Sequence, residues 1–455
     1  MGNFRAEIRG LWKLALPVMV VQVGLMAMGV VDTIVAGHIP HGDGALAAVA
    51  LGALYSFACV LVPFGILTAL DPLIAQAFGA HDGVAVDDEF RRGLLLAVLL
   101  SVPAALAMLP GEAVFALTGQ PEEIIPRAAL FARWNMLGTL PFLLFAVVRT
   151  LLQATHRLRH VVIAVILANV TNLMLNLVLV LGWGGVESLG VTGSALATVI
   201  SRWLMLLSLL VLAWRELAPH LARLRPRWAE DMPGLRRILG LGLPIAGQFF
   251  LEWGAFGVAA LLMGRMGPVP VEGHQVAVNL ASFSFMFPLG ISIAAGVRVG
   301  NAIGAGDMPA ARRAAFAALV SGIGVMCGFA LLFLLLPNQF AALYTDQAAS
   351  AAVAATLIPL AGIFQIFDGT QVVSIGILRG VGDTRAPFII NIIGFWCLGV
   401  PAGMWLAFEQ DLGPAGLWWG LVLGLASVAI LLVTRARKAL KSDVARISSH
   451  AHRLH

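Results

Sequence analysis

The feature that most constrains this 455-residue chain is a succession of twelve apolar stretches, separated mostly by short polar segments. A helix that spans a membrane needs about 20 mostly apolar residues, and each stretch reaches that length. Apolar side chains make up 60% of the chain and charged ones only 12%, and the mean hydropathy is +0.91. Too few charges remain to cover a soluble protein of this size. The sequence therefore predicts an all-α polytopic membrane protein and excludes soluble enzymes and nucleic-acid-binding proteins.

Six of the predicted spans lie in each half of the chain. They lie near residues 11–36, 46–77, 93–115, 129–154, 160–181, 190–214, 238–263, 272–303, 314–336, 350–378, 386–407 and 413–434. The long polar stretch 215–237 is rich in arginine, so we predict a cytoplasmic linker there. We accordingly expect a six-helix lobe at 1–214, a second at 238–434 and a cytoplasmic tail at 435–455.

The positive charges predict the orientation of the chain. If both termini lie on one side, that side holds 23 of the 29 lysines and arginines, and the opposite loops hold only Arg127 and Arg265. Loops that stay in the cytoplasm are enriched in lysine and arginine. We therefore expect both termini in the cytoplasm.

The two halves repeat one another. Leu14-Ala-Leu-Pro17 recurs as Leu241-Gly-Leu-Pro244, 227 residues later, and Ala77-Phe-Gly-Ala-His-Asp82 recurs as Ala302-Ile-Gly-Ala-Gly-Asp307 after 225. Each half has an even number of spans, so both insert in the same direction, as in transporters with parallel repeats. Two such bundles around a central cavity favour alternating access. A duplicated structural membrane protein is the alternative.

Two acidic residues lie about midway through predicted spans of the second half, Glu252 and Asp368. A carboxylate inside a bilayer costs on the order of 3 kcal/mol, so its presence indicates a function. A pair at one depth could hold a proton, a monovalent cation or a cationic substrate. The alternative is structural neutralisation by a buried arginine, for which Arg298 and Arg379 are the candidates.

A second candidate site lies in the first half. Asp32 is near the outer end of the first span, and Asn172 and Asn176 share a helix face because they are four residues apart. With Thr198 they could supply neutral oxygens to a cation beside Asp32. Interfacial solvation of Asp32 and helix-to-helix bonding by the asparagines are the alternatives. A further acidic residue in a span, Asp71, has no apparent partner, and its role stays open.

Helix flexibility and missing motifs favour transport over catalysis. Pro17 and Pro244 lie inside spans, where proline loosens a helix and allows gating, although fixed kinks are the alternative. The three lysines do not follow glycine, so no Walker A motif exists, and His-Glu-x-x-His and Gly-x-Ser-x-Gly are also missing. These features predict a secondary transporter that is not an enzyme and has no cofactor beyond its coupling ion.

Several segments resemble one known family. They are Gly273-His274-Gln275-Val276-Ala277-Val278-Asn279, Phe285-Met-Phe-Pro288, Arg298-Val-Gly300, Ala75-Gln-Ala-Phe-Gly-Ala80 and Leu378-Arg-Gly-Val-Gly-Asp-Thr384. Together they resemble the multidrug and toxic compound extrusion (MATE) transporters, in their NorM-like bacterial branch. The resemblance covers nearly the whole chain.

The resemblance implies a twelve-span fold of two lobes around a cavity, in a bacterial inner membrane. It implies export of amphipathic, mostly cationic compounds in exchange for Na⁺ or H⁺, by a monomer whose partners are small molecules and membrane lipid. Glu252 and Asp368 match the family's C-lobe cation site, where Na⁺ is the metal ion to consider, and Asp32 matches its N-lobe acidic residue.

The same resemblance assigns supporting or gating positions to His274, Gln275 and Asn279. Some members have an aspartate where this chain has Asn176, a departure that weakens an N-lobe metal site and favours protonation of Asp32. A flippase for lipid or lipid-linked precursors and a membrane-embedded enzyme are the rival functions. The natural substrate and the choice between Na⁺ and H⁺ stay open.

Overall fold

The computed structural model describes residues 2–39, 44–223, 228–442 and 444–447, and these form helices without any strand. Residues 224–227 of the predicted linker and 448–455 of the predicted tail lie outside the described ranges. Eleven described helices are long and apolar enough to cross a membrane, and a bent pair, Gly83–Leu106 with Gly111–Leu117, raises the number to as many as twelve. The twelve segments coincide with the twelve predicted spans, so the predicted fold class is confirmed.

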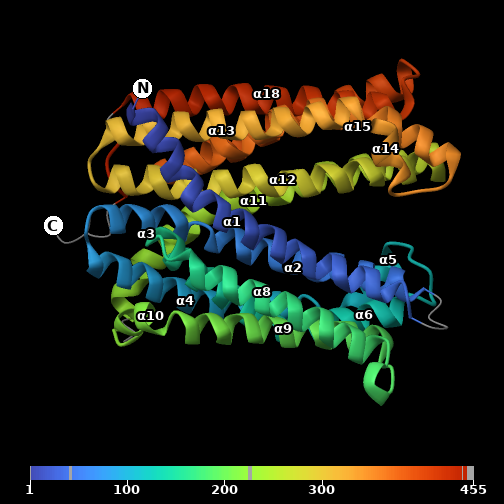
Figure 1. The fold of residues 1–455 in the computed structure, drawn as a ribbon, viewed down its shortest axis with the longest axis horizontal. Coiled ribbons are helices and arrows are strands. Elements are labelled where there is room, and N and C mark those ends of the chain that lie inside the picture. The colour runs from blue at the N-terminus through green and yellow to red at the C-terminus, as the bar shows by residue number, and fades with distance from the viewer. Residues whose placement is uncertain (1, 40–43, 224–227, 443, 448–455) are drawn as a thin grey trace. The chain divides into compact units, whose positions relative to one another are not determined.

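The chain forms two compact units (Figure 1). The first comprises the described parts of Met1–Met19, Asp71–His81 and Gly247–His455, and the second comprises Val20–Leu70 and Asp82–Ala246. Helices α1 (Gly2–Ala36) and α11 (Trp228–Met266) contribute to both units. Their junctions between units, at 19–20 and 246–247, are separated by the 227-residue offset of the repeat. The lobe boundary at 215–237 stays a prediction.

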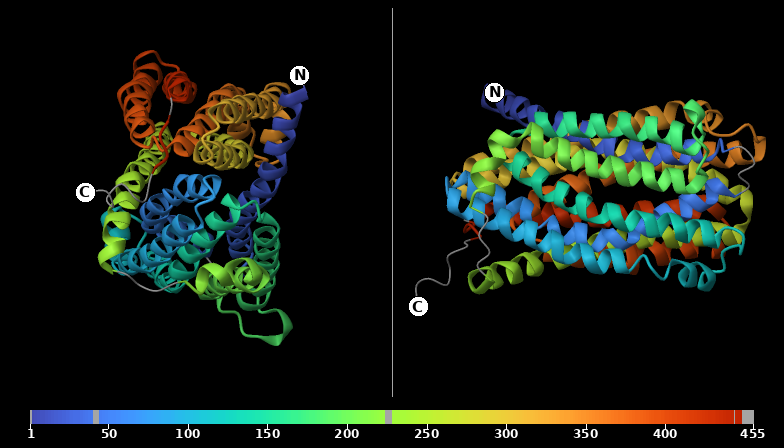
Figure 2. Two further views of the ribbon diagram at one scale, coloured as in Figure 1. Left: turned by 90° about the vertical axis from the view of Figure 1, so that its left-hand side faces the viewer. Right: turned by 90° about the horizontal axis from the view of Figure 1, so that it is seen from below.

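The first unit is built around four long helices that lie side by side, α12, α13, α15 and α18 (Figures 1 and 2). Its elements besides α1 and α11 are α3 (Leu70–Gly79), α12 (Pro268–Gly304), α13 (Met308–Leu335), α14 (Pro337–Ala342), α15 (Ala348–Val381), α16 (Arg385–Asn391), η4 (Ile392–Gly399), α17 (Val400–Met404), η5 (Trp405–Glu409) and α18 (Gly413–Lys441). Helix α15 packs against α12, α13 and α18 and is therefore the central helix of this unit.

The second unit contains most of the first six spans. Its remaining elements are α2 (Ala45–Leu67), α4 (Gly83–Leu106), α5 (Gly111–Leu117), α6 (Ile125–Asn135), η1 (Met136–Gly138), α7 (Thr139–Ala154), α8 (Leu158–Leu175), η2 (Asn176–Val180), η3 (Trp183–Gly185), α9 (Gly190–Leu212) and α10 (Trp214–Leu221). Helix α8 packs against α9, α2 against α6, and α4 against α7. Much of the predicted linker is helical, in α10 and the start of α11.

The repeat is visible in two equivalent helix starts. Asp82 caps α4 by accepting the backbone N–H of Ala85 at 3.0 Å, and Asp307 caps α13 by accepting that of Ala310 at 2.8 Å. The backbone angles of the two aspartates agree, with φ −93° and ψ 79° for Asp82 and φ −93° and ψ 78° for Asp307. A capping aspartate satisfies amide groups that the first helical turn leaves unpaired. The duplicated motif therefore encodes the same local structure twice.

Two further equivalent residues make a very close helix crossing. A Cβ atom on Gly79 would lie 2.0 Å from the backbone oxygen of Asn301, and one on Gly304 would lie 2.0 Å from that of Gln76. Each glycine thus lies against the backbone of the residue that is three positions before the other glycine. Since no side chain fits at such a distance, only glycine permits α3 and α12 to approach this closely.

Candidate functional site

The structure brings together all four residues of the predicted N-terminal site. Asn172 and Asn176 donate their side-chain N–H groups to Asp32 Oδ1 at 3.1 and 2.8 Å, and Thr198 Oγ1 donates to Asp32 Oδ2 at 2.5 Å. Asp32 is 5% exposed, so its carboxylate has exchanged water for these donors. Three donors on one carboxylate stabilise its charge. This geometry is inconsistent with the alternative that water at the membrane interface solvates Asp32.

The asparagines present nitrogen to Asp32, whereas the sequence led us to consider their oxygens. Both Oδ1 atoms are buried without a hydrogen-bond partner among the described residues. A 180° rotation of either amide would turn an oxygen toward Asp32. Asn176 is also the first residue of the π-helical turn η2, and such turns occur often at functional sites. Arg202, one turn beyond Thr198, interacts electrostatically with Asp32.

The second candidate site pairs α11 with α15. Gln371 donates to Glu252 Oε1 at 3.0 Å, and Asp368, which is buried, interacts electrostatically with Glu252. Gln371 Oε1 is itself buried and has no hydrogen-bond partner among the described residues. Two carboxylates and an amide oxygen are the donor types that hard cations accept. Glu252 and Asp368 thus lie near enough to interact electrostatically, and a shared ion site stays a prediction.

One of the two candidate arginines faces this site. Arg379 Nη2 donates to Gln248 Oε1 at 3.4 Å, and its guanidinium lies over the ring of Phe249, 5.0 Å from the centroid. It interacts electrostatically with both Glu252 and Asp71. Arg298 instead pairs with Glu7 near the N-terminus. Structural neutralisation therefore applies to Glu252 in part, because its arginine is shared with a second carboxylate.

The supporting residues predicted on α12 lie apart from these contacts. His274 is buried and packs edge-on against the ring of Trp418, with centroids 5.9 Å apart. Gln275 Nε2 donates to Asn279 Oδ1 at 3.3 Å on an exposed face. Pro17 and Pro244 lie inside α1 and α11. The described contacts of these five residues include none with Glu252 or Asp368, and their supporting or gating roles stay predictions.

Sequence reasoning missed the polar neighbours of the acidic residues. Gln248 accepts a hydrogen bond from Arg379, and Gln371 donates one to Glu252 from the neighbouring helix. Their positions carried a usable signal, because Gln248 lies one helical turn before Glu252 and Gln371 lies three residues after Asp368. Glutamines one turn from an acidic residue in an apolar span indicate a polar cluster.

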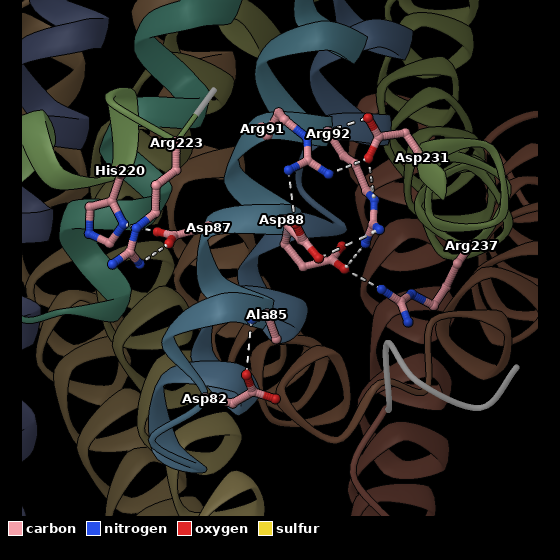
Figure 3. A network of polar contacts seen from close by, with 11 residues as sticks. Asp82, Ala85, Asp87, Asp88, Arg91, Arg92, His220, Arg223, Asp231 and Arg237 are labelled. Atoms are coloured by element: carbon pink, nitrogen blue, oxygen red, sulfur yellow. Dashed lines mark hydrogen bonds and ion pairs between the residues drawn. The ribbon is translucent and has the colours of Figure 1, made fainter. Parts of the chain in front are cut away.

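A buried network of charges, also missed, fastens α10 and α11 to α4 (Figure 3). Asp231 is 1% exposed and accepts hydrogen bonds from Arg91 Nη2 at 2.6 Å and Arg92 Nε at 3.2 Å. Arg237 pairs with Glu89. These contacts hold the start of α11 against α4, within the segment that the sequence predicted as a cytoplasmic linker.

The same network reaches α10 through Asp87, which pairs with His220 and, at 2.5 Å, with Arg223. The hydrogen bond and the charge of Asp87 raise the pKa of Arg223. Within α4 itself, Arg91 pairs with Asp88, and Arg92 pairs with Glu89 and, at 3.9 Å, with Asp88. The charged side chains of α4, α10 and the start of α11 are thereby packed together as ion pairs.

Comparisons with known proteins agree with the geometry. The MatE family model matches the chain twice, at residues 17–178 and 244–405, and the 227-residue offset between the matches confirms the internal duplication. The chain is 34% identical over 459 residues to multidrug resistance protein MdtK of Pectobacterium atrosepticum, covering 100% of both chains. It is 37% identical to a probable multidrug resistance protein NorM of Mesorhizobium japonicum, covering 95% of this chain and 94% of the other. In fold it resembles the crystal structure of the eukaryotic MATE transporter AtDTX14, with TM-score 0.86, 24% identity, and coverage of 96% and 99%.

Proposed function

Since the chain belongs to the MatE family of membrane transporters, we propose that it is a multidrug efflux antiporter driven by Na⁺ or H⁺. Its substrates are amphipathic, mostly cationic small molecules. The names of the relatives, multidrug resistance proteins MdtK and NorM, support the efflux of several compounds. The chain acts as a monomer in a bacterial inner membrane, with both termini in the cytoplasm.

The observation that carries this proposal is the excess of carboxylates at the α11–α15 site. Asp368 interacts electrostatically with Glu252, and Glu252 and Asp71 both interact with Arg379. An uncompensated negative charge away from water is costly, so such a site gains free energy from any small cation that enters it. A proton or Na⁺ meets this requirement, and so does the positive group of a drug.

Coupling follows from competition for that charge. When Glu252 and Asp368 hold the incoming ion, they attract a cationic drug less, and when the ion leaves they attract it again. Antiport requires that ion and drug differ in their affinity for the two facings of the transporter. Asp32 with its three donors is a second protonatable carboxylate, which acts in the same cycle from the other unit.

The test is efflux from proteoliposomes loaded with ethidium, a fluorescent amphipathic cation, with Na⁺ and H⁺ gradients imposed separately. We expect one gradient or both to drive efflux in the wild type. Glu252→Gln and Asp368→Asn should abolish driven efflux at normal protein levels. Glu187→Gln, which removes an exposed loop carboxylate, is the matched control and should leave it unchanged. Full driven efflux in both site variants would refute the proposal.

A further inference from the structure

Helix α3 is attached to the second half of the chain by a buried glutamine. Gln76 is 0% exposed, its Nε2 donates to the backbone oxygen of Gly380 at 2.9 Å, and its Oε1 accepts the backbone N–H of Ile447 at 2.8 Å. The glycine crossing of α3 with α12 adds a second close contact at the same end. All these residues belong to the first unit. The position of α3 is therefore tied to the end of α15.

The residue before Gly380 is Arg379, whose charge links α3 to the candidate ion site. Asp71, near the start of α3, and Glu252, on α11, both interact electrostatically with it. The guanidinium contacts α11, because Nη2 donates to Gln248 Oε1 at 3.4 Å and the group lies over the Phe249 ring, 5.0 Å from its centroid. One positive group thus lies within the influence of two carboxylates on two helices.

This sharing has a direct consequence for ion binding. A guanidinium and a small cation satisfy the same carboxylate, so each weakens the binding of the other. Whatever draws Arg379 away from Glu252 favours the ion. After the ion has neutralised Glu252, Asp71 remains as an anionic partner of Arg379. The interaction between α15 and α3 then gains strength.

We propose that Arg379 is a built-in competitor of the coupling ion at Glu252 and that Asp71 is the positioning residue that draws it away. Ion binding is thereby linked to the attachment of α3 to α15. This inference rests on the proposed antiport function and assigns a role to Asp71, which lies in an apolar span. Asp71 and Arg379 do not contact the transported drug in this scheme; they set the affinity for the ion.

The scheme predicts shifts of opposite sign in the ion concentration that gives half-maximal ethidium efflux. Asp71→Asn leaves Arg379 to Glu252 alone, so this concentration should rise about tenfold, with the maximal rate retained. Arg379→Gln removes the competitor, so the ion concentration for half-maximal efflux should fall. The maximal rate should fall too, because the ion leaves slowly. The double variant should behave like Arg379→Gln, since Asp71 acts only through Arg379.

The measurement uses whichever ion drives the wild type, titrated in ethidium-loaded proteoliposomes containing equal amounts of protein. Asp71→Glu and Arg379→Lys keep the charges, so their half-saturating ion concentrations should remain near that of the wild type. These two variants test the inference if a neutral variant does not fold. Arg298→Gln, which removes an arginine paired with Glu7, should not shift the half-saturating concentration.

Shifts of the same sign in Asp71→Asn and Arg379→Gln, or no shift in either, would overturn the inference while driven efflux in the wild type left the antiport function standing. A purely structural role would lower protein yield and maximal rate without separating the two half-saturating concentrations. Driven efflux that persists in Glu252→Gln would instead remove the proposed role of Glu252 in ion binding, and this inference with it.

Discussion

Replacing Asp231 by asparagine tests how firmly α11 is fastened to α4. Removing one partner of a buried ion pair costs about 3–5 kcal/mol, because the other charge stays buried without compensation. Here the lower end applies, since Arg91 keeps Asp88 at 2.9 Å and Arg92 keeps Glu89 at 2.7 Å. We therefore expect a loss of about 3 kcal/mol in the free energy of unfolding of the second unit.

The assay is the apparent melting temperature of the detergent-solubilised protein, followed by size-exclusion chromatography after heating. At roughly 2–4 °C per kcal/mol, the expected decrease for Asp231→Asn is about 6–12 °C. Glu122→Gln removes an exposed carboxylate and should leave the melting temperature unchanged. Adding Arg91→Gln to Asp231→Asn removes the excess positive charge and should recover part of the loss.

An unchanged melting temperature in Asp231→Asn would refute this reasoning, because it would show that these ion pairs do not stabilise the contact between α11 and α4. A decrease that Arg91→Gln does not reduce would mean that shape, and not charge, decides the contact.

Three further predictions follow from the fold and the N-terminal site. Gly79→Ala should lower the free energy of unfolding by at least about 2 kcal/mol, because its Cβ would lie 2.0 Å from the Asn301 backbone oxygen. Gly83→Ala is the control, since a Cβ there has nothing within 4 Å, and it should leave the free energy of unfolding unchanged. Thermal melting compares the two variants. Thr198→Val should reduce stability by about 2 kcal/mol through loss of the 2.5 Å hydrogen bond to Asp32, and Thr198→Ser should retain it; an equal effect of both variants would contradict this. Green fluorescent protein fused to either terminus should fluoresce and alkaline phosphatase fused there should be inactive, since both ends are expected in the cytoplasm.

The spans were predictable because they depend on local composition and length alone. Each needs a long apolar run, and the bilayer fixes how long that run must be. The grouping of Asn172 with Asn176 was equally accessible, because residues four apart share a helix face. That both reach Asp32 was a hypothesis until the structure was known, since no local rule states which face of α8 meets α1.

The partner of Glu252 was beyond local rules. Arg298 and Arg379 looked equivalent in sequence, and only the packing of α15 beside α11 selects Arg379. Local rules also failed to identify the partners of Asp231. Its charged surroundings indicated a linker, because a sequence lists charges without showing which of them face one another across 140 residues.

The crossing of α3 and α12 has a consequence for the origin of the chain. Its two contacts use the same surface from each half, with Gly79 and Gly304 exchanging roles. A contact of this kind is self-complementary, as in symmetric dimers. It requires only one kind of half, so two separate copies of an ancestral six-helix protein could have associated through it before a gene fusion joined them.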